Sequence, residues 1–305
     1  MISGSRLLAA TLGRISPRYR TLGDWSETYK QIIAAKPVSE KTKANRRVSL
    51  GHILKGIGLD RTISGIKPHE IAGMVMQVAA TRPQCAKRIL IEAKDMFSEA
   101  VNYGWIDRNP ATPIKAPHVR VQRQRLTLEQ WRQIYAYSQA QQPPWVSRML
   151  VLALVTGQRR SDVCKMRFDD IWDGHLHIEQ LKTGERLALP VGLRLNVLGV
   201  SIEEAVESCR AYAVGSDYLL RKHNGKQLVL ASLSSRFEEA REQALPVFKT
   251  GLPPSLHECR SLAERLYRAQ GINTMILLGH KHQSMTDLYN DDRGLSRGEW
   301  RCLTL

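Results

Sequence analysis

The chain has 305 residues, a formal net charge of +16, 43% hydrophobic residues and 24% charged residues. This length accommodates two domains with a sizeable core, and the composition is that of an ordinary soluble protein. No run of eighteen apolar residues is present. Residues 1–10 are too weakly apolar for a secretory signal. We therefore expect no membrane span and no membrane partner.

The cysteine pattern indicates the redox compartment. The cysteines are scattered, odd in number and without close pairs, which argues against a disulfide framework and against a zinc finger. It predicts reduced thiols in a cytoplasmic protein. The residues concerned are Cys85, Cys164, Cys209, Cys259 and Cys302.

The positive charge is concentrated in the N-terminal part of the chain. Residues 1–125 hold 22 Lys and Arg against 9 Asp and Glu, whereas residues 126–305 hold 23 against 20. Such asymmetry is typical of a polyanion-binding module joined to a nearly neutral one. An anionic membrane could also attract such a module, but no strongly amphipathic basic helix with an aromatic face stands out. Nucleic acid is the better partner.

A helical domain is expected in the N-terminal part. Residues 1–22 are basic and lack periodicity, which indicates a tail or a linker. Asp24 is placed to cap a first helix, and three more helices are expected to begin near residues 39, 67 and 83. Residues 23–108 are therefore predicted to form a four-helix domain. The expected inner residues of the second helix are Val48, Leu50, Ile53 and Leu54.

A proline-rich break over residues 109–125 predicts a linker, and three arginines make its second half look exposed. The second domain is expected over residues 126–305, with Thr127 capping its first helix. An alternating pattern over residues 176–189 then predicts a β-hairpin with Lys182 at or near its tip.

Helical patterns resume after Ile202, and Gly279 is placed to end an apolar helix. The chain is therefore predicted to be mainly α with a small β-sheet or hairpin. It would combine a helical DNA-binding domain with an α+β second domain.

Clustered basic residues predict the surface that contacts DNA. A charge run is often only a solvated helix face, but the regional excess of positive charge favours phosphate contact here. Lys and Arg can neutralise phosphates, while Asn45 could read a base edge. The candidate DNA-binding residues are Lys41, Lys43, Asn45, Arg46, Arg47, Lys87, Arg88, Arg123 and Arg125.

Two blocks of sequence carry a pattern of reactive residues. In the later block, His257 and Arg260 share a helix face, and residues 277–280 (Leu-Leu-Gly-His) and then Tyr289 follow. In the earlier block, residues 155–162 (Val-Thr-Gly-Gln-Arg-Arg-Ser-Asp) place an acidic residue three positions after an arginine. With Glu-Gln-Leu-Lys-Thr-Gly between them, these blocks resemble the signatures of the tyrosine recombinases, the phage integrase family. The nearest likeness is to the lambda-type integrases.

The resemblance implies metal-independent and cofactor-free cleavage of a DNA phosphodiester. Arg159 and Arg260 would hold the non-bridging oxygens as bidentate donors. Tyr289 would be the nucleophile and would form a 3′-phosphotyrosyl bond. A 5′ hydroxyl from another strand could then attack this bond and rejoin the DNA without ATP.

The remaining roles also follow from the resemblance. Lys182 would act as general acid toward the leaving 5′ oxygen, and His257 would assist the tyrosine by acid–base catalysis. His280 would hydrogen-bond the phosphate, and Asp162 would support the site from behind.

Simpler structural interpretations compete with some of these assignments. Arg160 lies beside Arg159, so charge alone does not distinguish them and only the motif register favours Arg159. Lys182 could be a plain turn lysine. His175 and His177 share one strand face, a spacing that a metal could use, but no acidic or cysteine partner lies at a matching distance, so no metal site is expected.

The function expected from the resemblance is site-specific DNA recombination, integrating or excising a mobile element such as a phage or prophage. The alternatives are a DNA-binding architectural or regulatory protein that has lost catalysis, and an enzyme like the type IB topoisomerases. The expected partners are double-stranded attachment sites of the core type and further copies of the chain, as dimers to tetramers on DNA. A host DNA-bending protein and an excisionase are further candidates, and the location would be the bacterial cytoplasm and nucleoid.

The two ends of the chain carry further expectations. Lambda-type integrases have a small N-terminal domain that binds arm sites, and residues 1–22 are too few to form a core unaided, so they are expected to be a tail or a truncated remnant of that region. Residues 295–305 include Trp300, Leu303 and Leu305, which predicts exchange of this tail among protomers.

Overall fold

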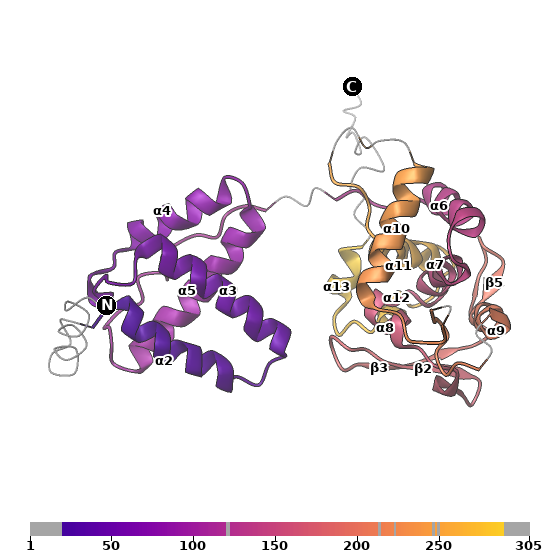
Figure 1. Ribbon diagram of the computed structural model, residues 1–305, viewed down its shortest axis with the longest axis horizontal. Coiled ribbons are helices and arrows are strands. Elements are labelled where there is room, and N and C mark those ends of the chain that lie inside the picture. Colours follow the sequence, from indigo (N-terminus) through magenta and orange to yellow (C-terminus); the bar gives the residue numbers. More distant parts are fainter. Residues whose placement is uncertain are drawn as a thin grey trace, which may run out of the picture. The chain divides into compact units, whose positions relative to one another are not determined.

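The computed structural model describes residues 20–119, 123–212, 215–222, 224–245, 248 and 251–289. The chain divides into two compact units, Met1–Val121 and Gln122–Leu305 (Figure 1). The expectations for residues 1–19 and for the tail with Trp300, Leu303 and Leu305 lie outside the described residues.

The first unit contains the four expected helices. A buried aromatic core holds them together, with Trp25 and Tyr29 fully buried and with the Trp25 indole nitrogen donating to the Met96 carbonyl at 3.2 Å. A short 3-10 turn, η2 (Ile63–Gly65), joins the second and third helices. The helices are α2 (Leu22–Ala35), α3 (Glu40–Ile57), α4 (Pro68–Ala79) and α5 (Pro83–Asn102).

Two expectations for this unit were wrong in detail. Thr21 rather than Asp24 caps α2: the Thr21 hydroxyl accepts from the Asp24 backbone N–H, and the Asp24 carboxylate accepts from the Thr21 N–H, each at 3.1 Å. Asp24 thus forms the second half of a capping box, a role that the same sequence pattern also fits. Val48 is 62% exposed on α3, whereas Leu50 and Ile53 are buried as expected.

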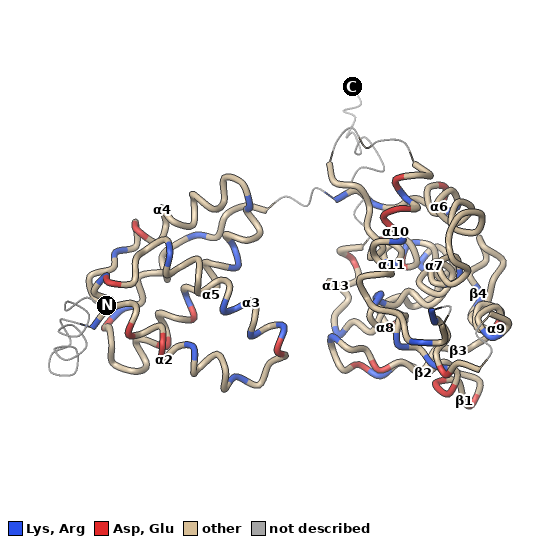
Figure 2. Tube along the Cα trace, in the orientation of Figure 1, with Lys and Arg blue, Asp and Glu red and all other residues tan. Residues whose placement is uncertain are grey.

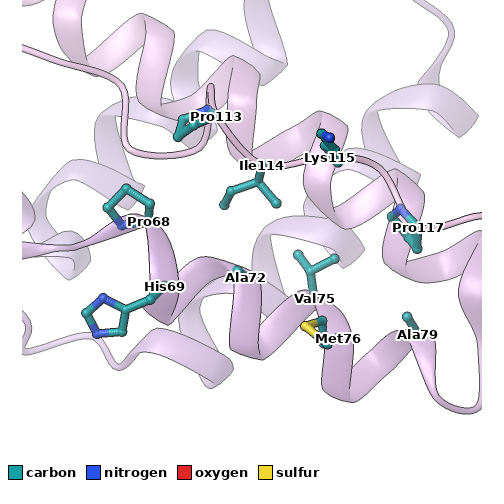
Figure 3. A pocket seen from close by; sticks show the side chains of 10 residues that line it. All are labelled: Pro68, His69, Ala72, Val75, Met76, Ala79, Pro113, Ile114, Lys115 and Pro117. Carbon is teal, nitrogen blue, oxygen red and sulfur yellow. The ribbon is translucent and has the colours of Figure 1, made fainter.

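The segment after α5 packs on the first core. Ala111 is fully buried there and Ile114 packs beside it, so the first part of the proline-rich segment belongs to this unit. Together with α4, the segment lines an apolar pocket of ≈ 450 Å³ (Figure 3). Val75, Met76 and Ile114 contribute to its wall. This pocket lies in the first unit, whereas the six candidate catalytic residues all belong to the second.

The second unit is helical with two small antiparallel sheets. The first sheet has the order β1 (Ile171–Trp172), β2 (His175–Glu179) and β3 (Arg186–Pro190), and the second pairs β4 (Arg194–Leu195) with β5 (Val200–Ser201). A 3-10 turn, η3 (Phe168–Asp170), precedes the first sheet. The helices are α6 (Leu128–Gln141), α7 (Pro144–Thr156), α8 (Arg160–Lys165), α9 (Ile202–Tyr212), α10 (Leu230–Ala244), α11 (Glu258–Ala269), α12 (Thr274–Leu278) and α13 (Gln283–Asp287).

The central element of this unit is α7, which is buried along nearly its whole length. It packs against α6, α9, α10 and α11 (Figure 1). A side-chain bond ties it to α11, because the Tyr267 hydroxyl donates to the Val155 carbonyl at 2.8 Å. The mainly helical fold with small sheets confirms the predicted fold class. None of the described helices combines the length and hydropathy that crossing a bilayer requires.

Candidate active site

Arg159 is positioned by the end of α7. Gly157 ends this helix in the left-handed conformation, with φ 64°, and Arg159 then takes the N-cap position of α8. A side chain at Gly157 would bring its Cβ to 3.1 Å from Leu278, so the glycine also permits close packing on α12. The Arg159 Nη1 donates to Gln180 Oε1 at 2.6 Å. Arg160, the alternative arginine, instead donates to Ser234 on α10.

Arg260 lies in the first turn of α11 and is only 1% exposed. It donates to three neutral acceptors: the carbonyl of Gly157 at 2.9 Å, the carbonyl of Leu278 at 2.5 Å, and Nε2 of His280 at 3.1 Å. Burial and the nearby positive charge of Arg159 lower the pKa of Arg260 to about 10, so it remains charged near neutrality.

His280 follows Gly279, which caps α12 with φ 61° as expected. The side chain is 7% exposed, and its Nδ1 lies 2.9 Å from the hydroxyl of Thr286 on α13. Because the Arg260 guanidinium can only donate, Nε2 must accept, which assigns the proton to Nδ1. Burial, followed by the charges of Arg260 and Arg159, lowers the pKa of His280 to about 4. This histidine is therefore neutral near pH 7.

Tyr289 lies on the turn that follows α13. Its ring stacks on that of His280, with centroids 5.6 Å apart and planes inclined by 10°. The hydroxyl lies 3.5 Å from Nε2 of His257. Its backbone is held as well, since the Ser261 hydroxyl donates to the Tyr289 carbonyl at 3.4 Å. The stacking and the backbone bond fix the tyrosine beside both histidines.

His257 takes the N-cap position of α11. Its side chain is exposed to solvent at the surface of the site, yet the protein atoms packed around the ring, and then the charges of Arg260 and Arg159, lower its pKa to about 4. Lys182 adds to this effect from the hairpin turn, where its own side chain is exposed. A neutral imidazole next to the Tyr289 hydroxyl can accept a proton.

The predicted hairpin consists of β2 and β3, and Glu179 pairs with Arg186 at the end of the two strands next to the turn. Lys182 lies in this turn, in agreement with its expected position near the tip. Asp162 anchors the turn from α8, because its Oδ1 accepts from the Leu181 backbone N–H at 2.9 Å. The other oxygen, Oδ2, is buried without a hydrogen-bond partner. The catalytic lysine candidate is therefore attached to the same helix that Arg159 caps.

Three residues contribute to this site without any local sequence signal. Gln158, which lies in the first arginine motif, and Gln180 are both buried and donate to carbonyls of α12, and the side chain of Gln180 also donates to Gln158 Oε1 at 2.8 Å. Thr286 fixes His280. Gln158 and Gln180 lie inside the quoted sequence blocks and Thr286 lies after the Leu-Leu-Gly-His block, but none is distinguished there by type or spacing.

The candidate DNA-binding residues divide into three groups. The side chains of Lys41, Asn45, Arg47, Lys87 and Arg88 are exposed on α3 and α5, where Figure 2 marks the Lys and Arg positions. Those of Lys43 and Arg123 are partly buried. Lys43 pairs with Glu40 at 3.1 Å, and Arg123 Nη1 donates to the Pro253 carbonyl at 3.3 Å.

Arg46 and Arg125 differ from what was expected. Arg46 turns inward and pairs with Glu92 at 3.1 Å and with Asp95. Arg125 was expected in an exposed linker, but it is 2% exposed and pairs with buried Glu258 at 3.1 Å. The expected exposure of these arginines was wrong, because each of them pairs with a carboxylate. These acidic partners lie far away in the sequence, so no local pattern indicates the pairing.

Within the part of the chain that the structure describes, no group of three His, Cys, Asp or Glu side chains could hold a metal ion. The His175 and His177 rings are 6.2 Å apart, and His177 stacks on Trp172 at 3.5 Å.

Comparison with known proteins identifies the family. The model of the phage integrase family matches residues 124–294. The prophage integrase IntE of Escherichia coli K12 is 40% identical over 277 residues, which is 88% of this chain and 69% of that protein. A crystal structure of a lambda integrase dimer bound to a core site superposes with a TM-score of 0.86 at 34% identity, covering 93% of this chain and 99% of that one.

A second lambda integrase structure, a tetramer bound to a Holliday junction, has a TM-score of 0.85 at 33% identity and covers 93% of this chain and 80% of that one. The family model covers more than half of this chain, and the residues it matches include the whole site described above. The chain therefore belongs to the phage integrase family, the tyrosine-type site-specific DNA recombinases.

Proposed function

We propose that this recombinase cuts and rejoins core-type attachment sites through a 3′-phosphotyrosyl bond to Tyr289. The observation that carries the proposal is the position of the Tyr289 hydroxyl, 3.5 Å from a neutral His257 and stacked against His280 beside Arg260. A phenol next to a proton acceptor and a buried cation, Arg260, is equipped to attack an anionic phosphodiester.

In the cleavage step, the Tyr289 oxygen forms a bond to phosphorus and the bond from phosphorus to the 5′ oxygen breaks. His257 accepts the phenolic proton: its lowered pKa leaves the imidazole neutral, and the tautomer that carries its proton on Nδ1 presents Nε2 as the acceptor. Lys182 supplies a proton to the departing 5′ oxygen. In the rejoining step a 5′ hydroxyl attacks the phosphotyrosine, and the same two proton transfers run in reverse.

The charge that develops on the phosphate is met by Arg159 and Arg260. Both arginines donate to neutral acceptors in the bonds described above, so their positive charge remains available to an anion. His280 lies against Arg260 and would donate to a phosphate oxygen in the tautomer that carries the proton on Nε2, in place of the bond that Nε2 accepts from Arg260. Such preorganised donors are typically worth about 3–4 kcal/mol each in transition-state stabilisation.

The substrate would be held by both units. Residues 23–108 would form a core-binding domain that tracks the phosphates through α3 and α5, residues 109–125 would link it, and residues 126–305 would carry catalysis. The lambda integrase structures, a dimer on a core site and a tetramer on a Holliday junction, support assembly of this chain as dimers to tetramers on DNA. A host DNA-bending protein and an excisionase are further proposed partners, with the reaction in the bacterial cytoplasm.

The test uses suicide duplexes, nicked near the scissile phosphate, prepared from the borders of the element that encodes this chain. The wild-type chain should form a covalent adduct on denaturing gels, and Tyr289→Phe should bind the duplex with unchanged affinity and form none. An adduct with Tyr289→Phe would refute the nucleophile. Absence of any adduct with the wild type would favour a DNA-binding protein without catalysis.

A further inference from the structure

Gln180 stands at the centre of the hydrogen bonds that surround the two arginines. It is 1% exposed, and its side-chain amide uses its full capacity of two acceptor and two donor positions. Oε1 accepts from Arg159 Nη1 at 2.6 Å and from the Thr183 hydroxyl at 2.8 Å. Nε2 donates to Gln158 Oε1 at 2.8 Å and to the Leu278 carbonyl at 3.0 Å. Because a carbonyl only accepts, the orientation of the amide is fixed.

The Leu278 carbonyl joins the two arginines. It accepts from Gln180 Nε2 and also from Arg260 Nη2, at 2.5 Å. A continuous path therefore runs from Arg159 through the Gln180 amide and the Leu278 carbonyl to Arg260. The packing at this point is close, since a Cβ on Gly279 would lie 3.0 Å from Gln180 Nε2. Displacing the amide would move one arginine relative to the other.

The same residue also closes the turn that carries Lys182. Its backbone N–H donates to the Glu185 carbonyl and its carbonyl accepts from the Gly184 N–H, each at 2.8 Å. The Thr183 hydroxyl adds a side-chain hydrogen bond to Gln180 Oε1. The amide of Gln180 is therefore bonded both to Arg159 and to the neighbour of Lys182.

We propose that Gln180 is a positioning residue that holds Arg159, Arg260 and the Lys182 turn in one arrangement around the scissile phosphate. The inference rests on the proposed function. Only a neutral amide of this length fits the role. A glutamate would lose both donors and place a negative charge beside Arg159, and a methionine would fill the space without any of the four bonds. Misplacement of reacting groups by about 1 Å costs about 100-fold in rate.

The experiment measures single-turnover formation of the covalent adduct on two matched suicide duplexes, after the cleavage position has been mapped. One duplex carries the natural 5′ oxygen at that position, and the other carries sulfur in its place. A thiolate leaves without a proton donor, so the sulfur duplex bypasses Lys182 but still requires both arginines. Lys182→Ala, slow on the oxygen duplex and restored on the sulfur duplex, calibrates the comparison.

Gln180→Met should slow adduct formation on the oxygen duplex by about 10- to 100-fold, with DNA affinity and thermal unfolding near the wild-type values. The sulfur duplex should restore this variant only in part, because Arg159 remains displaced. Full restoration would overturn the link to Arg159, and a wild-type rate on the oxygen duplex would overturn the proposal. If Gln180→Met does not fold, Gln180→Glu takes its place; it keeps an acceptor for Arg159 but loses both donors and neutralises the arginine, so adduct formation should be slow on both duplexes.

Thr183 provides a matched pair for the turn, since its exposed side chain can change without risk to the core. Thr183→Val should be slower than Thr183→Ser on the oxygen duplex and should recover fully on the sulfur duplex. Equal rates for the two variants would show that the Thr183 hydroxyl does not position the Lys182 turn, and would refute that part of the proposal. A wild-type chain that forms no adduct on either duplex would refute the proposed function itself, whereas an active wild type with unaffected Gln180 variants would refute only this inference.

Discussion

The guanidinium of Arg125 lies 5.8 Å from the centre of the Tyr289 ring, and its Nη2 donates to the Leu288 carbonyl at 2.5 Å. Its Nη1 pairs with buried Glu258 in the first turn of α11, next to His257. One arginine therefore connects the first residues of the second unit with the turn that presents Tyr289, the proposed nucleophile.

This connection predicts a stability defect and a separate activity defect. Arg125→Met leaves Glu258 buried without its cation and should lower the free energy of unfolding of the second unit by about 3–5 kcal/mol. Combining it with Glu258→Gln should restore much of that loss, because the buried charge is gone. The double variant should nevertheless form the Tyr289 adduct more slowly than the wild type, because the bond from Arg125 to the Leu288 carbonyl is missing. Urea unfolding and adduct formation measure the two effects, and a double variant with full activity would contradict the second.

His280 predicts a pH dependence of stability. Its pKa is about 4 in the folded chain against 6.5 for an unperturbed histidine, so the unfolded chain binds more protons between these values. The free energy of unfolding should therefore be greatest above pH 6.5 and should fall as the pH drops toward 4, by up to about 3 kcal/mol from this residue. Urea unfolding of wild type and His280→Gln at pH 7 and pH 5 tests this. An equal loss in both proteins would exclude His280 as its source.

Arg46 and Arg47 are neighbours with opposite expected roles. Arg47 is exposed, and Arg47→Ala should reduce the slope of log affinity against log salt by about 1, as expected for one lost phosphate contact. Arg46 is paired with Glu92 and Asp95, so Arg46→Ala should instead cost about 1.5–3 kcal/mol of stability in the first unit and leave the slope unchanged. DNA titrations at several salt concentrations, with thermal unfolding alongside, separate the two variants. A reduced slope for Arg46→Ala would place its side chain on DNA.

Gly157 allows a comparison of backbone strain with packing. Gly157→Ala would force alanine into a left-handed conformation and bring its Cβ to 3.1 Å from Leu278. Gly174→Ala meets the same backbone penalty, of about 1–2 kcal/mol, with nothing within 4 Å. We expect Gly157→Ala to lose more stability in urea unfolding, and equal losses would show that α12 moves aside without cost.

The features that could be predicted from the sequence are those encoded locally. The Thr127 cap, the hairpin around Lys182 and the glycine at the end of α12 each depend on residues within a few positions of one another. Their residue types and spacings match the sequence patterns that are typical of helix caps and hairpins. The order of the motifs then led to the family.

The features that could not be predicted depend on distant partners. Arg125 is buried by a carboxylate 133 positions later, and Arg46 by Asp95, 49 positions later. Before folding, these arginines look like any others in a basic segment. Gln180 is likewise unremarkable in sequence, since its partners come from the first arginine motif and from the end of α12. Only the tertiary fold shows which polar groups meet.

Tyr289, the proposed nucleophile, comes after the other five candidate catalytic residues in chain order, on the turn that follows α13. During synthesis, N-terminal domains fold before the rest of the chain has emerged. The first unit, with the proposed DNA-contacting residues on α3 and α5, can thus fold while Tyr289 is still inside the ribosome. A chain released before residue 289 would keep that unit and lack the proposed nucleophile, so we expect it to bind DNA without cleaving it.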